Sequence, residues 1–283
     1  MNPIIDVAQL KEIGYLANLV IVDARSSKEK YDQSHLSGAI HFDLDTQMSD
    51  IKDDVSKGGR HPLPEVGDFL KTLSATGISP QNHIVIYDDM GGANAAARLW
   101  WMLRAVGHEQ VQVLNGGYQT AVAEGIACDA QEVQLPWAYE VFEAEDWLVP
   151  IASLEEVKEV SKSGGQYIID VRAAARYRGE IEPIDLVAGH IPNAHNIPLT
   201  ENLDEAGLFR SPEALRELYQ PLQDRFGHDQ IIVHCGSGVT ACHTLLAMNY
   251  AGYDVSKLYV GSWSEWSRLY LPMATGADSN SHI

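Results

Sequence analysis

The sequence predicts an α/β protein built from two tandem copies of one domain, each a mostly parallel sheet with helices on both faces. The first observation is an internal repeat, in which residues 21–25 (IVDAR) match residues 168–172 (IIDVR). A second pair of blocks, residues 84–92 (IVIYDDMGG) and 231–239 (IIVHCGSGV), lies at the same spacing of 147 positions. Two separate matches at one spacing indicate a duplication. The other observation is that short apolar runs alternate with amphipathic segments, which is typical of βα units around a parallel sheet.

The apolar runs have the length and composition of buried β-strands. They lie at residues 19–22, 84–87, 111–114, 168–171 and 231–234. Two amphipathic segments, residues 64–73 and 212–219, are predicted to be helices, and Ser211 can cap the helix that starts at Pro212. Ligands of such sheets bind beyond the carboxyl ends of the strands, so functional residues are expected there.

The repeat also suggests where the domains begin and end. Residues 1–130 are predicted to form the first domain, and residues 150–283 the second. Residues 131–149 lack a clean helical period, contain Pro136 and are rich in acidic side chains. This stretch is therefore predicted to be an extended linker.

Composition narrows the possible functions. The 283 residues include 20 Lys and Arg against 39 Asp and Glu, a formal net charge of −19, so neither nucleic acid nor an anionic membrane is an expected partner. No apolar run approaches the roughly 18 residues of a membrane-spanning helix. Three cysteines, Cys128, Cys235 and Cys242, form no C-x-x-C pair, which favours a reduced compartment and a cytoplasmic location. Cys128 and Cys242 are expected to be buried as small apolar side chains.

Cys235 lies in a different setting, at the junction between a strand and a helix. It follows the predicted strand at 231–234, is followed by Gly236 and Gly238, and precedes a helix expected from about Thr240. Loop N–H groups can converge on one point at such a junction, and the helix N-terminus adds partial positive charge. This setting favours the thiolate form of a cysteine and an anion bound beside it.

The two copies differ at this position. At the spacing of 147, Cys235 is aligned with Asp88, so only the second copy has the thiol. The second copy also contains the longer stretch 175–188, which brings Arg176 and Arg178. Because arginine offers planar, permanently charged recognition of oxyanions, we expect the active site for an anionic substrate in the second copy.

Four chemistries compete for Cys235. A metal site is suggested by His234 and His243, but no further ligand pair with zinc-like spacing exists. A cysteine phosphatase needs the pattern C-x5-R, and position 241 is Ala241. A disulfide oxidoreductase needs C-x-x-C, which is absent. The remaining chemistry is a nucleophile that attacks sulfur and holds it as a persulfide inside a loop of N–H donors.

Other polar and aromatic residues have structural interpretations. Asp170 and Arg172 are expected to form an ion pair at the end of a strand rather than to act in catalysis. Trp263 and Trp266 are three positions apart, so they are expected to pack on one face of a helix.

Five motifs together resemble the two-domain rhodanese-type sulfurtransferases over nearly the whole chain. They are YDDMGG at 87–92, DVRAAARYRG at 170–179, GHIPNA at 189–194, CGSGVTA at 235–241 and GSWSEW at 261–266. The resemblance implies two tandem rhodanese-like domains, of which the first is non-catalytic. It also implies that Cys235 takes a sulfane sulfur from a small anionic donor, either thiosulfate or 3-mercaptopyruvate. The sulfur would then pass to cyanide, a thiol or a thioredoxin-like protein.

The resemblance further implies which loop residues hold the persulfide. They are Gly236, Ser237, Gly238, Val239 and Thr240. The thiosulfate branch of the family typically has Arg-Lys directly after the cysteine. Gly236 and Ser237 instead resemble the 3-mercaptopyruvate branch, which makes 3-mercaptopyruvate the favoured donor.

A proton relay is also implied, because the pyruvate enolate that leaves 3-mercaptopyruvate ultimately needs a proton. Ser237 is the candidate donor or relay, and His61 and Asp45 match the residues that would extend it. Judged from its own surroundings, His61 before a proline is more typical of a solvated loop histidine.

Arg176 matches a substrate-binding arginine of the family, whereas Ile184 replaces a second one and Arg178 is the candidate to compensate. No metal or organic cofactor is expected. The alternative function is a regulatory or binding module that carries a persulfide and turns over small donors poorly.

Overall fold

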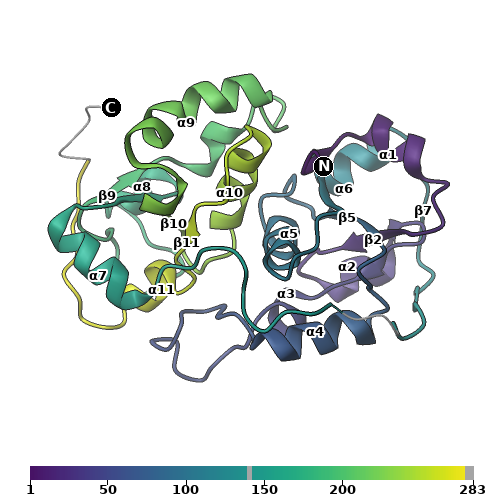
Figure 1. Ribbon diagram of the computed structural model, residues 1–283, viewed down its shortest axis with the longest axis horizontal. Helices are drawn as coiled ribbons and strands as arrows, with labels where there is room; N and C mark the ends of the chain where they lie inside the picture. Colours follow the sequence, from purple (N-terminus) through teal and green to yellow (C-terminus); the bar gives the residue numbers. More distant parts are fainter. Residues whose placement is uncertain (139–141, 278–283) are drawn as a thin grey trace. The chain divides into compact units, whose positions relative to one another are not determined.

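The computed structural model describes residues 1–138 and 142–277 and divides the chain into two compact units (Figure 1). The first unit comprises residues 1–50, 64–148 and 205–209. The second comprises residues 51–63, 149–204 and the chain from Arg210 onward. The segment 51–63 therefore folds with the second unit, although it lies within the first half of the sequence. The domain boundaries expected at 130 and 150 stay a prediction.

The first unit contains a parallel sheet whose strand order is β1-β6-β5-β2-β4 in the described residues. Its strands are β1 (Ile4–Ile5), β2 (Leu19–Asp23), β4 (Ile40–His41), β5 (His83–Tyr87) and β6 (Val111–Leu114). Strand β5 is buried along its whole length, as expected for a central parallel strand. A short antiparallel pair, β3 (His35–Leu36) and β7 (Cys128–Asp129), lies outside this sheet.

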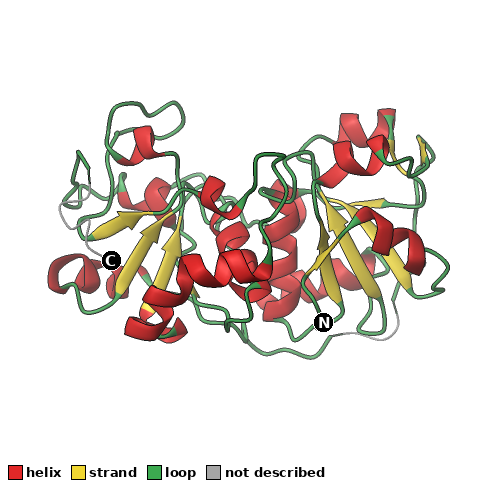
Figure 2. Ribbon diagram, turned by 90° about the horizontal axis from the view of Figure 1, so that it is seen from above, coloured by secondary structure: helices red, strands yellow, loops and turns green. Residues whose placement is uncertain are grey.

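Helices alternate with these strands, and Figure 2 shows helices on both faces of the sheet. They are α1 (Val7–Ile13), α2 (Lys28–Gln33), α3 (Leu44–Gln47), α4 (Val66–Ala75), α5 (Ala95–Ala105) and α6 (Gly117–Ala123). Side-chain caps start several of them. In α3, the Asp43 carboxylate accepts hydrogen bonds from the N–H groups of Asp45 and Thr46.

The second unit repeats this arrangement. Its parallel sheet has the order β11-β10-β8-β9 in the part of the unit that is described. The strands are β8 (Tyr167–Asp170), β9 (Ala194–Asn196), β10 (Ile231–His234) and β11 (Lys257–Leu258). Ile151 bridges to Leu258 in parallel, at the place that β1 takes beside β6 in the first unit. The predicted duplication is thus confirmed by the order of the strands.

The helices of the second unit also follow the predicted pattern. They are α7 (Leu154–Ser163), α8 (Ala174–Tyr177), α9 (Pro212–Phe226), α10 (Ala241–Tyr250) and α11 (Ser262–Trp266), with 3-10 turns at η1 (Leu199–Asn202) and η2 (His228–Gln230). Helix α9 begins as expected, because the Ser211 side chain accepts from the Ala214 N–H and Pro212 occupies the first turn. Among the described helices, none is both long and apolar enough to cross a bilayer.

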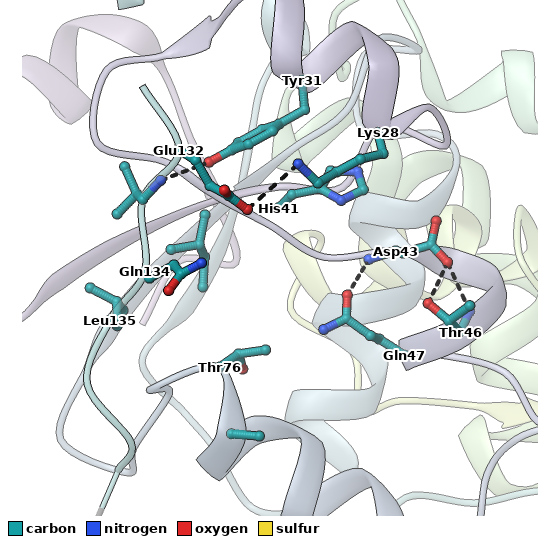
Figure 3. Close-up of a pocket in the computed structure, with 13 residues that line it drawn as sticks. Lys28, Tyr31, His41, Asp43, Thr46, Gln47, Thr76, Glu132, Gln134 and Leu135 are labelled. Atoms are coloured by element: carbon teal, nitrogen blue, oxygen red, sulfur yellow. Dashed lines mark hydrogen bonds and ion pairs between the residues drawn. The ribbon is translucent and has the colours of Figure 1, made fainter. Parts of the chain in front are cut away.

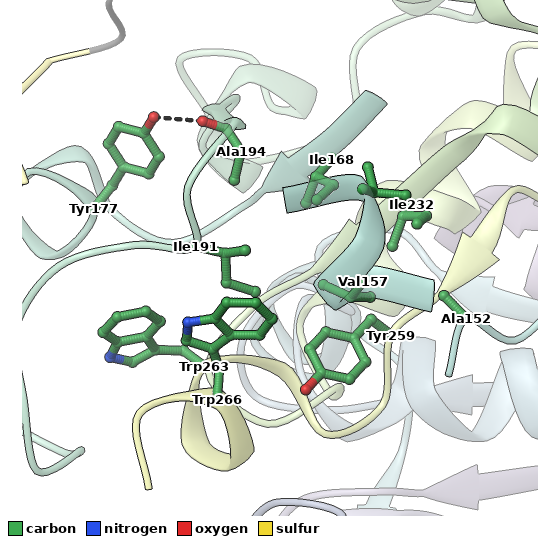
Figure 4. Packing of buried hydrophobic residues seen from close by; sticks show 11 residues of the cluster. Ala152, Val157, Ile168, Tyr177, Ile191, Ala194, Ile232, Tyr259, Trp263 and Trp266 are labelled. Atoms are coloured by element: carbon green, nitrogen blue, oxygen red, sulfur yellow. Dashed lines mark hydrogen bonds between the residues drawn. The ribbon is translucent and has the colours of Figure 1, made fainter. Parts of the chain in front are cut away.

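A cluster of buried side chains joins the sheet of the second unit to its helices (Figure 4). Ile168 of β8 and Ile232 of β10 contribute from the sheet, and Val157 contributes from α7. Trp263 and Trp266 of α11 belong to the same cluster and are almost fully buried. Their predicted packing role is confirmed, and it anchors α11, which in turn contacts the loop after β10.

The prediction that Cys128 is buried is wrong, because this thiol is exposed. Cys128 belongs to β7, which in the described part of the chain pairs with the two-residue strand β3 and lies outside the main sheet. Cys242, by contrast, is buried in α10 as expected.

Candidate active site

Cys235 directly follows β10, whose central position in its sheet places the thiol at the carboxyl end of the strands. Residues 235–240 form a loop between β10 and α10, which begins at Ala241. Cys235 is buried, as is Ser237 two residues later. The predicted strand, loop and helix are therefore all present, and the thiol lies where parallel sheets bind ligands.

Helix α11 holds the loop by its backbone. The Trp263 N–H donates to the Cys235 carbonyl at 3.1 Å, and the Ser264 N–H donates to the Gly236 carbonyl at 2.8 Å. These bonds turn the carbonyls toward α11. Gly238 has φ of +72°, and a Cβ there would lie 2.5 Å from the Val260 carbonyl oxygen, so only glycine fits this turn.

The matching loop of the first unit shows what this backbone shape can bind. Asp88, which is aligned with Cys235, is fully buried in its own loop. Its Oδ1 accepts from the N–H groups of Met90 at 2.9 Å and Gly92 at 2.8 Å, and its Oδ2 accepts from those of Asn94 at 3.0 Å and Ala96 at 3.2 Å. Four backbone N–H donors thus converge on one carboxyl group, so the loop at this point of the fold directs its N–H groups at a single acceptor.

The ring of His61 lies beside the hydroxyl of Ser237. The His61 Nδ1 and the Ser237 Oγ are 2.8 Å apart, which is hydrogen-bond distance. The contact forms because residues 58–61 are attached to α11: the Gly58 N–H donates to the buried Glu265 carboxylate at 2.8 Å. Gly59 permits the close approach, since a Cβ there would lie 2.5 Å from the Gly261 carbonyl oxygen. His61 is therefore not simply a solvated loop residue.

Asp45, the other predicted relay residue, belongs to the first unit. It lies in α3, and its N–H donates to the Asp43 side chain at 3.1 Å. Because His61 and Asp45 belong to different units, the relay between them stays a prediction.

Two arginines lie beside Gly236, the residue that follows Cys235. A Cβ built on Gly236 would lie 2.9 Å from Nη2 of Arg60 and 3.7 Å from both terminal nitrogens of Arg176. Arg176 therefore lies near the Cys235 loop, and its role in donor binding stays a prediction. Arg178 instead pairs with Glu180 at 2.6 Å, with a side chain that is 38% exposed, and its predicted role in donor binding stays untested by this contact.

Two carboxylates hold these arginines. Asp185 accepts from Arg60 at 3.2 Å and from Arg176 at 3.4 Å, and its side chain is fully buried. Glu182 pairs with Arg176 at 2.7 Å. Burial alone would raise the pKa of Glu182, but hydrogen bonds from Arg176 and from the N–H groups of Asp185 and Ile184 hold the pKa below its usual value. Glu182 is therefore ionised and fixes Arg176.

The predicted ion pair between Asp170 and Arg172 is confirmed, with a distance of 2.6 Å. Burial opposes ionisation of Asp170, but neighbouring His234 and Arg172 lower its pKa below the usual range. Burial likewise opposes the charge of Arg172, yet Asp170, Glu182 and the thiolate form of Cys235 keep its pKa raised. Arg172 therefore stays charged, paired with Asp170 and Glu182 and within electrostatic reach of Cys235.

Sequence reasoning missed Arg60 and Asp185. The available signal was weak: Arg60 immediately precedes His61, and Asp185 lies three residues after Glu182 in the inserted stretch. Within residues 1–138 and 142–277, no group of three or more His, Cys, Asp and Glu side chains could hold a metal ion.

A cavity of about 540 Å³ lies in the first unit, beside α2, α3 and α4 (Figure 3). Its lining groups are largely engaged with one another. Lys28 pairs with Glu132 at 3.7 Å, and the Tyr31 hydroxyl accepts from the Val133 N–H at 3.3 Å. None of the lining residues belongs to the Cys235 loop, so the cavity is separate from the candidate active site.

Comparisons with known proteins cover nearly the whole chain. The family model described as Rhodanese-like domain matches residues 6–124 and 153–269. The chain is 38% identical over 271 residues to a probable 3-mercaptopyruvate sulfurtransferase of Pseudomonas aeruginosa, covering 92% of this chain and 93% of that protein. It is 35% identical to a putative thiosulfate sulfurtransferase, SseB, of Mycobacterium tuberculosis, covering 87% and 84%. The structure of 3-mercaptopyruvate sulfurtransferase from Leishmania major matches with a TM-score of 0.79 and 31% identity, covering 95% of this chain and 75% of that one.

Proposed function

The chain belongs to the rhodanese family, and from that premise we propose that it is a sulfurtransferase that carries the transferred sulfur as a persulfide on Cys235. The similarity to sulfurtransferases along most of the chain supports this function. The observation that carries the mechanism is Asp88, whose carboxylate is bound by four N–H groups in the loop that matches the Cys235 loop.

The first half-reaction forms the persulfide. The Cys235 thiolate attacks the donor's outer sulfur, so that a new S–S bond forms as the donor's own bond to that sulfur breaks. Sulfite leaves thiosulfate with the electron pair. Pyruvate enolate leaves 3-mercaptopyruvate with the electron pair and then takes up one proton. In the second half-reaction cyanide or a thiolate attacks the outer persulfide sulfur, and Cys235 leaves as thiolate.

The loop stabilises the charged persulfide. By analogy with the Asp88 loop, the backbone N–H groups of residues 236–240 surround the terminal sulfur, where negative charge accumulates. Ser237 also belongs to the relay: its hydroxyl, 2.8 Å from the His61 ring, supplies the proton to the enolate. Asp45 extends the relay as the family resemblance implies.

The stretch 175–188, which is longer in the second copy than in the first, binds the donor. Arg176 lies beside Gly236 and is fixed by Glu182, so it binds the donor's anionic end. Arg178 remains the second candidate from the sequence. The Gly236-Ser237 pair favours 3-mercaptopyruvate as donor. Thiols, cyanide and thioredoxin-like proteins are the proposed acceptors, in the cytoplasm.

Mass spectrometry of the intact protein tests the proposal. After treatment with either donor, the protein is expected to gain one sulfur atom on Cys235, and addition of cyanide is expected to remove it. An unmodified mass under turnover conditions would contradict the mechanism. A stable persulfide combined with poor steady-state turnover of both donors would instead support the carrier or regulatory module.

Replacing Ser237 by alanine tests the relay. The variant is expected to lose kcat with 3-mercaptopyruvate about tenfold more than with thiosulfate, because the enolate needs a proton and sulfite does not. The measurement is the ratio of the rates with the two donors. A loss of folded protein lowers both rates equally and leaves this ratio unchanged. Ser163→Ala, at the exposed end of α7, is the matched control. An equal loss of kcat with both donors would contradict a role of Ser237 in the relay.

A further inference from the structure

Ser262, the first residue of α11, is a buried serine with a left-handed backbone. Its φ is +53° and its side chain has no exposed surface. An L-residue in this region has a conformational cost that glycine avoids, and such residues often lie at functional sites. Among the described residues other than glycine, Asn193 and Tyr270 also have a positive φ, but both are exposed. Ser262 is therefore the one of the three whose strain lies inside the fold.

The Ser262 hydroxyl holds the backbone of the nucleophile. Its Oγ accepts from the Cys235 N–H at 3.2 Å and donates to the Tyr259 carbonyl at 2.8 Å. The next residue, Trp263, donates its N–H to the Cys235 carbonyl at 3.1 Å. The N–H and the C=O of Cys235 are therefore both bound by the start of α11, which fixes the direction in which the thiol points.

The first unit has glycine at the matching position. In α6, the Tyr118 N–H donates to the Asp88 carbonyl at 2.9 Å, which repeats the bond between α11 and the nucleophile. Gly117, directly before Tyr118, therefore corresponds to Ser262, and its φ of +61° is also left-handed. A Cβ at Gly117 would lie 2.4 Å from the Asp88 carbonyl oxygen, so this space holds no side chain. In the unit that has the thiol, a serine side chain takes the corresponding place.

We propose that Ser262 is a positioning residue for Cys235, whose hydroxyl fixes the backbone of the nucleophile so that its sulfur faces both the donor and the N–H groups of residues 236–240. This inference rests on the proposed sulfurtransferase function and adds a residue outside the loop to its mechanism. Because the Cys235 N–H is bound to Ser262, it is not one of the donors that surround the persulfide. Glycine at position 262 would remove the strain and would also leave that N–H without its acceptor.

Two variants separate the hydroxyl from the strain. Ser262→Ala removes the hydroxyl and keeps an L-residue at a positive φ, whereas Ser262→Gly removes the hydroxyl and the strain together. The melting temperature of the glycine variant is therefore expected to exceed that of the alanine variant by about 2 °C. Both variants are expected to lose about fivefold in kcat with either donor, because a displaced nucleophile slows S–S bond formation, while KM changes less than about twofold.

Two control variants lie in the same unit. Ser256→Ala makes the same change at another fully buried serine, whose hydroxyl has no hydrogen-bond partner among the described residues. Tyr270→Gly removes the same kind of strain at a residue that is 99% exposed. Both controls are expected to leave kcat and KM unchanged, so that neither loss of a buried hydroxyl nor relief of strain affects the rate by itself.

Mass spectrometry of the same samples separates failure of this inference from failure of the proposed function. If Ser262→Gly keeps the wild-type kcat and only Ser262→Ala loses it, the loss follows the strain and the positioning role is overturned. Wild-type rates in both variants overturn it as well, while the function stands. If the wild-type protein forms no persulfide with either donor, the function is overturned, and the inference with it. Equal losses of kcat in both variants, with the persulfide still formed, support the inference.

Discussion

Replacing Cys235 by serine is expected to lower turnover with both thiosulfate and 3-mercaptopyruvate by roughly a thousandfold or more. The hydroxyl is almost entirely protonated at neutral pH, whereas a thiol readily gives the nucleophilic thiolate. The oxygen also cannot form the persulfide that the second half-reaction needs. The measurement is the rate of thiocyanate formation from cyanide with each donor, together with the mass of the donor-treated protein.

Cys128→Ser is the matched control for this prediction, because it makes the same atomic change at an exposed thiol. It is expected to leave the rate within about twofold of wild type, since surface substitutions away from a site have small effects. Residual activity of Cys235→Ser within tenfold of wild type would contradict a mechanism in which Cys235 carries the sulfur. So would a donor-derived sulfur found on Cys128 in the wild-type protein.

Much of the fold could be predicted because the duplication doubles each local signal. The pattern of strand, Asp-x-Arg and loop occurs twice, and in both copies the arginine folds back on the aspartate two residues before it. The Arg25–Asp23 pair has a distance of 2.7 Å and the Arg172–Asp170 pair 2.6 Å. Such contacts depend on neighbouring residues only, so a sequence pattern can identify them. The strand and helix that flank Cys235 are local in the same sense.

The contact between Arg60 and Asp185 could not be predicted, because it is not local in sequence. Arg60 and Asp185 are 125 positions apart, and the repeat assigns them to different copies. Their contact exists because residues 51–63 fold with the second unit and contact α11 at Gly59 and Glu265. No periodicity in the sequence indicates that this segment folds with the second unit, and the only signal is that Arg60 directly precedes His61, which the family resemblance links to Ser237. The exposure of Cys128 was missed likewise, because its burial depends on whether a short strand joins the main sheet.

The comparison of the two loops leads to a prediction about stability. In the first unit the N–H groups of residues 90, 92, 94 and 96 all donate to Asp88, and the carboxyl group is fully buried. Burial raises the pKa of Asp88, while these four hydrogen bonds act in the opposite direction. Without the carboxyl group, each of these N–H groups would lack a hydrogen-bond acceptor, which typically costs about 1–3 kcal/mol of stability.

Asp88→Ala is therefore expected to lower the free energy of unfolding of the first unit by about 3 kcal/mol or more. Urea unfolding followed by tryptophan fluorescence measures it, because Trp100 and Trp101 are buried in α5 of this unit. Asp89→Ala is the control: this neighbour forms an ion pair with Lys30 nearer the surface, and about 1 kcal/mol or less is expected. An Asp88→Ala change as small as the control would mean that the four donors find other partners. It would also weaken the analogy to the Cys235 loop, in which the negative charge lies on the thiolate or the persulfide of Cys235.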